Sequence, residues 1–308
     1  MRFCVVGGLN LDVIGTSFEK VVMEDSNIGS ISFSAGGVGF NIARELKRLG
    51  HEVALVTSLS TDRYGDYLGA FCEKEGLDLT ACIRAQEPTP TYMAIHSPDG
   101  NMVCGVNDMR ALKSLNGLEI IQRAAYINSF DALVTEANLE EDALLSLCEV
   151  AKVPIIADAV SANKCRRLQA ALPYLSALKL NCLEAQTLSG ESSPKGAGQA
   201  LLKRGAGCVL ISLGSEGAYV CDRKEDAFLK PEAHFTCQTN GAGDAMCAGL
   251  AQGCAQGQGA IQSATQAMAC AAKLLRSRQT ITTNTEKKDC FVGSKLQGGL
   301  EGSQPLQP

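Results

Sequence analysis

A glycine-rich turn that ends in an aspartate is the segment of this chain with the clearest chemical potential. The run Thr239–Gly253, TNGAGDAMCAGLAQG, places Gly241, Ala242 and Gly243 directly before Asp244 at the start of a predicted helix. A helix start offers free backbone N–H groups and a positive dipole end, which suit phosphate oxygens. Asp244 could there accept a proton from an attacking hydroxyl, while the three preceding residues form an anion hole for a phosphoryl group. An ordinary helix N-terminus, in which the glycines serve packing alone, is the alternative.

A second glycine-rich turn favours the catalytic interpretation. In the run Ser34–Gly50, SAGGVGFNIARELKRLG, Gly36 and Gly37 stand shortly before Asn41 and a predicted helix. A Gly-Gly backbone lets a ligand ring approach the main chain, and Asn41 can hydrogen-bond the hydroxyls of that ligand. The run is not the dinucleotide fingerprint, because no clear strand precedes it and no ribose-binding acid follows at the right distance. A plain tight turn remains the alternative.

Short apolar runs alternate with helical stretches along most of the chain and would position these turns. The runs expected as strands are Phe3–Gly8, Glu52–Leu59, Ala124–Asn128, Asp131–Thr135, Val153–Asp158, Ser176–Asn181 and Gly207–Gly214. Helical spacing is found at Asn41–Gly50, Asp62–Glu75, Leu139–Ala151 and Ala197–Arg204. Strands that alternate with helices predict an α/β fold, in which helices cover both faces of a parallel sheet.

Two segments break this alternation and predict a small second sheet. Asp12–Phe33 has strand-like pieces and turn residues but no good helix, and Pro90–Gly105 is typical of a hairpin around the turn SPDG. The proline of that turn restricts φ, and its glycine accepts a positive φ. We therefore expect residues of about 12–34 and 88–110 to form a β lid.

The end of the chain differs in composition from the rest. An Ala-rich helical stretch, Gly259–Arg278, is followed by a Gly-, Gln- and Ser-rich tail that runs to Pro308. A polar tail of this kind buries too little apolar surface to fold. We expect one domain over residues 1–284 and a disordered tail over residues 285–308.

Composition and charge exclude several classes of function. The chain has 308 residues, of which 45% are apolar and 20% charged, as in a globular enzyme with a large core. Its 28 basic and 33 acidic residues include no basic cluster, so no nucleic-acid partner is expected. The 14 cysteines include no CxxC pair and the three histidines are scattered, so no zinc site is expected.

The same residues indicate the compartment. No uninterrupted apolar run approaches the roughly 18 residues of a membrane span, and no signal peptide is visible. Cysteines such as Cys4 and Cys208 stand within apolar runs, which is typical of buried thiols in a reducing compartment. We expect a cytoplasmic protein with no membrane partner.

Together, the turns Gly36–Asn41 and Gly241–Asp244 resemble those of the ribokinase-like carbohydrate kinases of the PfkB type. The resemblance covers nearly the whole chain to about Arg278. It implies a three-layer α/β/α fold with a central, mostly parallel sheet and a small β-sheet lid. It also implies transfer of the γ-phosphate of ATP to an alcohol group of a small-molecule substrate, with Mg²⁺ on the phosphates and Asp244 as the base.

Further segments match this family in the same order. In GGLNLD, Gly7–Asp12, an acid such as Asp12 holds the sugar hydroxyls in the family, and Asn10 lies beside it. The family's Asn-x-x-Glu motif, which organises magnesium and the phosphates, is matched by Asn181 and Glu184, and no direct metal ligand is implied. The resemblance implies nucleotide contacts by Ser212, Gly214, Gly217 and Thr239.

One residue departs from the family's pattern. Gln238 stands three residues before Gly241, where the family often has an acid. The base is present, so catalysis is expected, whereas binding of a monovalent cation (K⁺) at this loop is left open.

Within the family, the run Ile155–Gly190 is similar to that of the pseudouridine kinases, as are Met102–Leu112 and Leu133–Lys152. This resemblance implies phosphorylation of the 5′-hydroxyl of pseudouridine, with four further residues near the substrate: Ser161, Lys164, Asn107 and Asp108. Ordinary roles are the alternative, a solvated helix residue for Lys164 and a turn former for Asp108. The residues by themselves predict only a polyhydroxylated substrate.

Two other functions stay open. One is a ribokinase-like kinase for another nucleoside or sugar, and the other is a catalytically silent relative that binds a nucleoside. The silent relative would be favoured by loss of Asp244 or of a glycine beside it, and all of these are present. The resemblance further suggests a homodimer formed through the lid.

Overall fold

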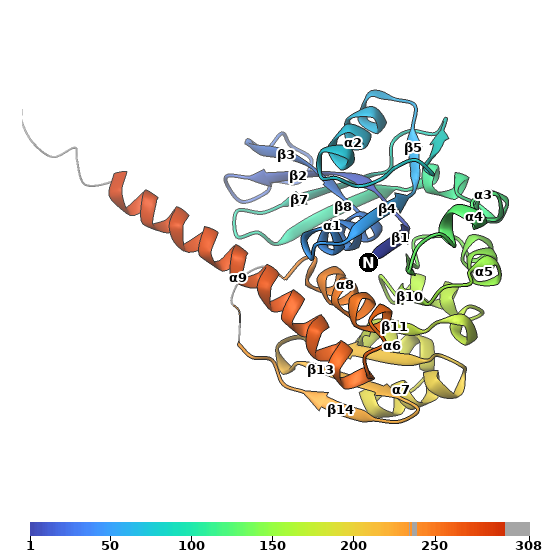
Figure 1. Ribbon diagram of the computed structural model, residues 1–308. Helices are drawn as coiled ribbons and strands as arrows, with labels where there is room; N and C mark the ends of the chain where they lie inside the picture. Colours follow the sequence, from blue (N-terminus) through green and yellow to red (C-terminus); the bar gives the residue numbers. More distant parts are fainter. Residues whose placement is uncertain (234, 236–238, 293–308) are drawn as a thin grey trace, which may run out of the picture.

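The computed structural model describes residues 1–233, 235 and 239–292, with the backbone alone from residue 279 onward. Eight strands form the main sheet (Figure 1). In spatial order they are β14 (Asp226–Leu229), β13 (Ala218–Asp222), β12 (Cys208–Ser212), β11 (Ala177–Asn181), β10 (Ile155–Asp158), β9 (Ala132–Glu136), β1 (Arg2–Val6) and β4 (Glu52–Val56). The strands from β12 to β4 are parallel, and β13 and β14 are antiparallel, so the predicted mostly parallel sheet is confirmed.

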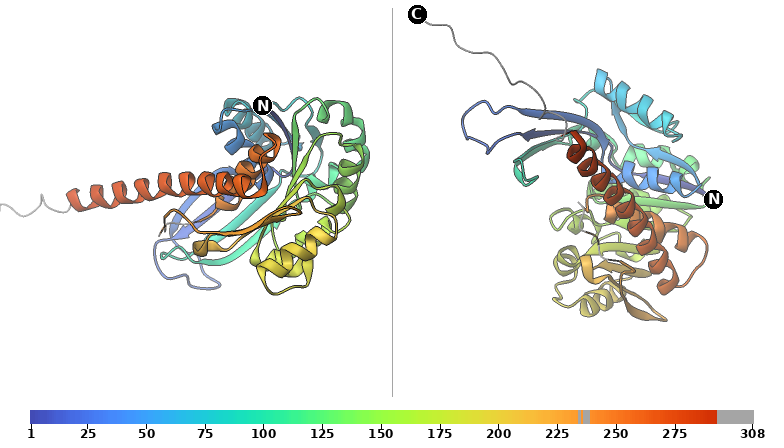
Figure 2. Two further views of the ribbon diagram at one scale, coloured as in Figure 1. Left: turned by 60° about the horizontal axis from the view of Figure 1, so that its bottom comes forward. Right: turned by 90° about the vertical axis from the view of Figure 1, so that its left-hand side faces the viewer.

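Helices cover both faces of this sheet, which gives the three layers visible in Figure 2. One layer holds α3 (Gly117–Gln122), α4 (Ala124–Ile127), α5 (Glu141–Val150), α6 (Cys182–Ser189) and α7 (Pro194–Lys203), with the short helices η2 (Lys164–Leu168) and η3 (Leu172–Tyr174). The other holds α1 (Val38–Arg48), α2 (Arg63–Lys74), α8 (Ala242–Ala255) and α9 (Ala260–Val292). The prediction that helices cover both faces of the sheet is therefore confirmed.

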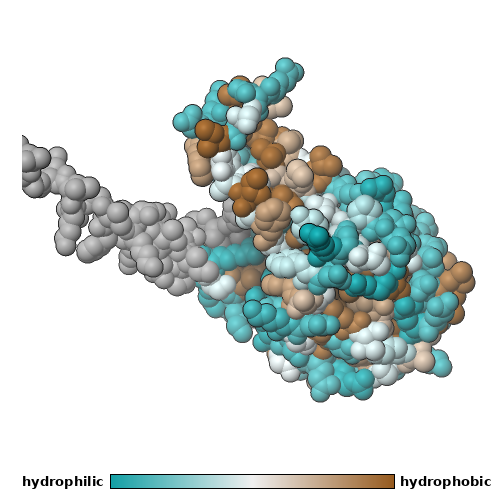
Figure 3. Space-filling model, turned by 90° about the horizontal axis from the view of Figure 1, so that it is seen from above, coloured by the Kyte–Doolittle hydropathy of each residue, from teal (hydrophilic) through white to brown (hydrophobic). Residues whose placement is uncertain are grey.

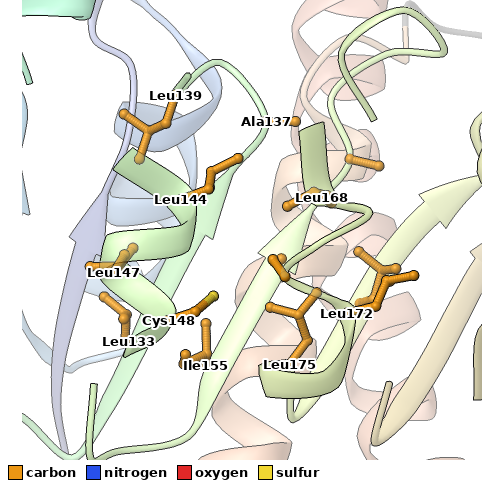
Figure 4. Packing of buried hydrophobic residues seen from close by; sticks show 14 of the residues in the cluster. Leu133, Ala137, Leu139, Leu144, Leu147, Cys148, Ile155, Leu168, Leu172 and Leu175 are labelled. Carbon is orange, nitrogen blue, oxygen red and sulfur yellow. The ribbon is translucent and has the colours of Figure 1, made fainter. Parts of the chain in front are cut away.

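Each layer packs its own apolar cluster against the strands. On the α5 side, leucines of the helix face Leu133 of β9 and Ile155 of β10 (Figure 4). Burial of a leucine or isoleucine side chain stabilises the fold by about 1.5–3 kcal/mol. Because the strands are buried on both faces, their sequences are continuous apolar runs, which is why most of them could be predicted.

A second sheet of four strands projects from the body. Its order is β3 (Gly29–Gly36), β2 (Asn10–Ser17), β7 (Thr91–His96) and β8 (Met102–Asp108), and β7 and β8 form the predicted hairpin. Asp12, with which the predicted lid segment begins, is the third residue of β2. A pair, β5 (Ser58–Ser60) and β6 (Ile83–Ala85), and two short helices, η1 (Arg110–Ser114) and η4 (Gly214–Glu216), complete the described elements.

Two segments differ from the expectation. Ala124–Asn128 was expected as a strand, but Ala124–Ile127 forms the short helix α4. Alanine favours helix, and a short apolar run does not by itself distinguish a strand from a buried helix. Residues 285–292, expected in a disordered tail, belong to α9. A helix that is already formed by packing extends at little cost per residue. The rest of that tail, residues 293–308, lies outside the described residues.

Candidate functional site

The carboxyl ends of the parallel strands bring charged groups to one edge of the main sheet. Glu136 of β9, Asp158 of β10 and Lys179 of β11 are register partners in adjacent strands, so they share one face. All three are buried, and α8 lies on β10 and β11 on that side. Buried charges are costly unless they are paired or used. Ligands of open α/β sheets bind at this edge, which makes it the candidate site.

The two glycine-rich turns meet here. The Asn41 amide of α1 donates a hydrogen bond of 2.9 Å to the Asp244 carboxylate in the first turn of α8. The two residues are 203 positions apart in the chain. The sequence predicted Asn41 as a sugar ligand, and the structure shows that its amide N–H₂ group orients the proposed base.

The surroundings of Asp244 bring its protonation close to neutral pH. Burial, and next the carboxylate of Asp158, raise the pKa of Asp244 to about 6. The Asn41 amide and the cations of Lys179 and Arg44 oppose this rise in pKa. A carboxylate whose pKa lies near the working pH is an effective general base, because it is ionised yet basic enough to take a proton.

The three residues predicted to form an anion hole lie at the start of α8. Gly241 is the N-cap, with a φ of 76°, and Gly243 and Asp244 follow in the first turn, where N–H groups have no intrahelical acceptor. The N–H group of Ala242 instead donates to the carbonyl oxygen of Thr239 at 3.0 Å. The N–H group of Ala242, predicted for the anion hole, thus has a backbone acceptor in the preceding turn.

A cavity of about 470 Å³ opens beside this helix start. Of the residues predicted to bind nucleotide, it is lined by Asn181, Ser212, Gly214, Gly217 and Thr239, and Ala242 and Gly243 of the predicted anion hole also line it. Apolar residues line it as well, among them Leu229, Pro231, Met268, Ala272 and Leu275. A cavity lined by both polar and apolar groups suits a phosphorylated aromatic ligand.

Glu184 does not line this cavity. Its side chain accepts hydrogen bonds from the backbone N–H and the side-chain amide of Asn181, at 2.7 and 2.6 Å. The Asn181 side-chain oxygen in turn accepts from the Glu184 N–H at 2.9 Å, so the pair forms a capping box at the start of α6. In the predicted Asn-x-x-Glu pair, Glu184 thus orients Asn181, which reaches the cavity.

The predicted sugar ligands lie at the inner end of the small sheet. The Asn10 amide donates to the Asp12 carboxylate at 2.5 Å. Gly37 has a φ of 103°, and a Cβ atom there would lie 2.5 Å from the Gly8 carbonyl oxygen. A Cβ atom on Gly36 would overlap the Asp12 carboxylate, so the two glycines keep this space open. Burial raises the pKa of Asp12, and the hydrogen bond from Asn10 opposes that rise.

One row of polar side chains crosses the small sheet at the level of Asp12. Ser34 of β3, Asp12, Tyr92 of β7 and Asn107 of β8 are successive register partners, so all four lie on one face. Asp108 is on the opposite face and forms an ion pair with Arg110 at 2.6 Å. Of the predicted pair Asn107 and Asp108, only Asn107 thus shares the face of Asp12.

Ser161 and Lys164 follow β10, at the same edge of the main sheet. The Lys164 ammonium donates to the side-chain oxygen of Asn138 at 2.5 Å, and its backbone N–H donates to the Ser161 hydroxyl at 3.4 Å. Burial lowers the pKa of Lys164, and the nearby Glu136 carboxylate opposes that shift. Lys164 is thus a partly buried cation at the site edge, and a fully solvated helix residue is excluded.

Sequence reasoning missed Glu136, Asp158 and Lys179. The Glu136 carboxylate accepts hydrogen bonds of 2.6 Å from the N–H groups of Gly8 and Asn138. Burial raises the pKa of Glu136 to about 7, against the effect of these two bonds. A usable signal was present, since each of the three is a charged residue at or near the carboxyl end of an apolar run. Gln238, predicted to affect cation binding, lies outside the described residues.

Comparison with known proteins identifies the family. The model of the pfkB family of carbohydrate kinases matches residues 2–288. The chain belongs to this family. The pfkB chain is 32% identical to a pseudouridine kinase of Escherichia coli strain K12 over 285 residues, which are 90% of this chain and 91% of that protein.

Solved structures agree on the fold. A carbohydrate kinase from Agrobacterium tumefaciens, 31% identical, matches with a TM-score of 0.80 over 88% of this chain and 89% of that one. A ribokinase from Thermotoga maritima, 22% identical, shares the fold with a TM-score of 0.80 over 88% and 92%. The predicted ribokinase-like fold is confirmed, and the chain is a sugar or nucleoside kinase, a phosphotransferase with an alcohol acceptor.

Kinases of this fold use ATP and Mg²⁺. The cavity fits the nucleotide, because it adjoins the start of α8 and its lining includes both polar and apolar residues. Within the described residues, no group of three or more His, Cys, Asp and Glu side chains could hold a metal ion. No helix in the described part of the chain is long and apolar enough to cross a membrane.

Proposed function

We propose that this pfkB kinase phosphorylates the 5′-hydroxyl of pseudouridine with ATP, giving pseudouridine 5′-phosphate and ADP. The observation that carries the proposal is the likeness to a pseudouridine kinase over nine tenths of both chains. The polar row on the small sheet supports it, since this row extends from the sugar ligand Asp12 toward the outer strand β8. A substrate larger than a free sugar would use such an extension.

The chemistry follows from the groups around Asp244. Asp12 and Asn10 hold the ribose hydroxyls, and Gly36 and Gly37 let the ring lie close to the backbone. Asp244 accepts the proton of the 5′-hydroxyl as that oxygen bonds to the γ-phosphorus. The bond from phosphorus to the β–γ bridging oxygen breaks, and its electron pair leaves with ADP. The first turn of α8 faces the charge that builds on the transferred group.

The base of the nucleoside is recognised by the outer half of the row. In pseudouridine the uracil ring is bonded through carbon, which leaves two ring N–H donors beside two carbonyl acceptors. The Asn107 amide has both a donor and an acceptor, and it matches one N–H and C=O pair of that ring. Tyr92, between Asp12 and Asn107, offers an aromatic face. With the nucleoside bound, the small sheet would act as the lid that excludes water from the site.

Two alternatives remain within the same geometry. Another nucleoside or a sugar would use Asp12, Asn41 and Asp244 in the same way and would differ at Tyr92 and Asn107. The silent nucleoside-binding relative is disfavoured, because Asp244 is present and hydrogen-bonded to Asn41. The proposal does not include a requirement for K⁺ at the loop that contains Gln238.

A panel of acceptors tests the substrate. We expect ADP release to be faster with pseudouridine than with uridine, adenosine or ribose, measured as kcat/KM at saturating ATP. Asn107→Ala should lower kcat/KM for pseudouridine by about tenfold, the worth of one or two hydrogen bonds, and leave ribose unaffected. Asp99→Ala, in the exposed turn of the same hairpin, is the matched control. A higher kcat/KM for ribose or adenosine would reject pseudouridine and leave the kinase assignment in place.

We further infer that two copies of this chain associate through the small sheet. The face opposite Asp12 is apolar, with Ile31, Phe33, Met93 and Val106 each about half exposed or more. Seen from above, hydrophobic patches gather on the projecting arm (Figure 3). An exposed apolar patch of this kind marks an interaction surface. We place the reaction in the cytoplasm, since the described cysteines are free and most are buried.

A further inference from the structure

Lys179 is the most deeply buried amino group among the charged residues of the site. It is the middle residue of β11, and its side chain is 8% exposed. Its Nζ atom lies 3.1 Å from an Asp158 carboxylate oxygen, and the Asp158 side chain is 2% exposed. Burial alone would lower the pKa of Lys179, but the carboxylates of Asp158 and Glu184 raise it, so the group is a cation.

The position of this cation relates it to phosphoryl transfer. A Cβ atom on Gly243 would lie 2.6 Å from Lys179 Nζ, so the ammonium group lies directly against the first turn of α8. Lys179 also lines the nucleotide cavity, next to Asn181 and Gly243. A side chain at position 243 would displace the ammonium from this place.

The ion pair engages one side of the Lys179 ammonium. One Asp158 oxygen lies 3.1 Å from Nζ, and the other accepts the Val160 N–H at 2.8 Å, which holds the carboxylate in place. An ammonium group has three N–H donors, so a contact with one Asp158 oxygen leaves donors for a further acceptor.

We propose that the Lys179 ammonium contacts the phosphoryl group during its transfer, and that Asp158 positions this ammonium. Negative charge spreads over the equatorial oxygens of the transferred group in the transition state, and a preplaced cation in a site that excludes water stabilises it. Lys179 and the α8 N-terminus would act from adjacent sides. The role holds for any acceptor, so it does not depend on pseudouridine as the substrate.

A purely structural ion pair is the competing explanation, and paired variants separate the two. Lys179→Met and Asp158→Asn each leave one buried charge without a partner, so each should lower Tm by roughly 5–10 °C. The double variant replaces the pair by neutral groups of similar size. The side-chain oxygen that Asp158→Asn retains could still accept from the Val160 N–H, so we expect the double variant to regain most of the wild-type Tm.

The kinetic result distinguishes the explanations. We expect the kcat of the double variant to remain about 10²–10³-fold below that of the wild type. The KM of the best acceptor should stay within threefold of the wild-type value. If the pair is only structural, kcat returns together with Tm in the double variant. That outcome, or a Lys179→Met enzyme with near wild-type kcat, would overturn the proposal.

Nucleotide binding gives a readout that does not depend on turnover. Calorimetry would compare ADP with a non-hydrolysable ATP analogue, both with Mg²⁺, on the wild type and the double variant. A contact with the transferred phosphoryl group predicts about tenfold weaker binding of the analogue, with ADP affinity within threefold. Equal losses for the two nucleotides, or no loss for either, would remove Lys179 from the phosphoryl site.

Discussion

Asp244, the proposed base, lowers the stability of the fold when it is ionised. Its pKa is raised from 3.8 to about 6, so between these values the folded chain binds more protons than the unfolded chain. The stability contributed by this group is therefore full below about pH 4 and is lost as pH rises through about 6. At neutral pH the ionised base is a source of instability that the rest of the fold offsets.

Asp244→Asn should reveal both properties in one preparation. We expect kcat to fall by about 10²–10⁴-fold, because the base is removed while the shape is kept. The free energy of unfolding at pH 7.5 should rise by roughly 1–3 kcal/mol, because a buried charge is removed. Steady-state kinetics and denaturant melts measure the two quantities. Near wild-type kcat in this variant would reject Asp244 as the base.

The pH dependence of the rate tests the same group without a mutation. We expect log kcat/KM to fall with a slope of one below about pH 6, where Asp244 becomes protonated. Asp158 raises the pKa of Asp244, and Asn41, Lys179 and Arg44 lower it. Asn41→Ala should thus move the acid limb to higher pH, because a hydrogen bond to the ionised form is lost. An acid limb at unchanged pH would show that the Asn41 amide does not stabilise the ionised form of Asp244.

Asp244 and the glycines could be predicted from the sequence because their chemistry lies in one short run. Glu136, Asp158 and Lys179 could not be grouped in this way. They lie in three different strands, and only the pairing register shows that they are neighbours. For the same reason the partner of Asn41 was missed, since nothing local links a residue of α1 to one of α8.

In the small sheet, the position of a turn could be predicted from the sequence, but the ends of a strand could not. The hairpin of β7 and β8 was predicted from its turn residues, but the extent of β2 was not. Asp12 was expected at the beginning of a segment with strand-like pieces, and it is the third residue of β2, paired with Ser34 and Tyr92. A carboxylate in the middle of a strand row faces a ligand rather than a turn, which strengthens its proposed role.

Asp12→Ala should raise the KM of the acceptor at least tenfold, because hydrogen bonds to a charged group are worth about 1.5–3 kcal/mol each. The KM of ATP should stay within twofold, since Asp12 is not among the residues that line the nucleotide cavity. Kinetics with each substrate varied in turn, and a melting curve on the same sample, provide the test. An unchanged acceptor KM with a lowered Tm would assign Asp12 a structural role.

The proposed dimer would form through the face of the small sheet opposite Asp12. We expect the wild type to be a dimer by light scattering after gel filtration, and Phe33→Glu to be monomeric, because a charge would be buried in the apolar contact. Ser32→Glu, the neighbouring position on the opposite face, is the matched control and should remain dimeric. A monomeric wild type at micromolar concentration would reject association through this face.

The separation of Asn41 and Asp244 by 203 residues also means that the ribosome synthesises them at different times. At about 5–20 residues per second, roughly 10–40 s separate the two residues as the chain leaves the ribosome. During that interval α8 is missing, and the apolar groups of α1 and β9 that it contacts lack this partner. The nascent chain therefore passes through a stage with one open sheet face, at which chaperone binding or aggregation would compete with completion of the enzyme.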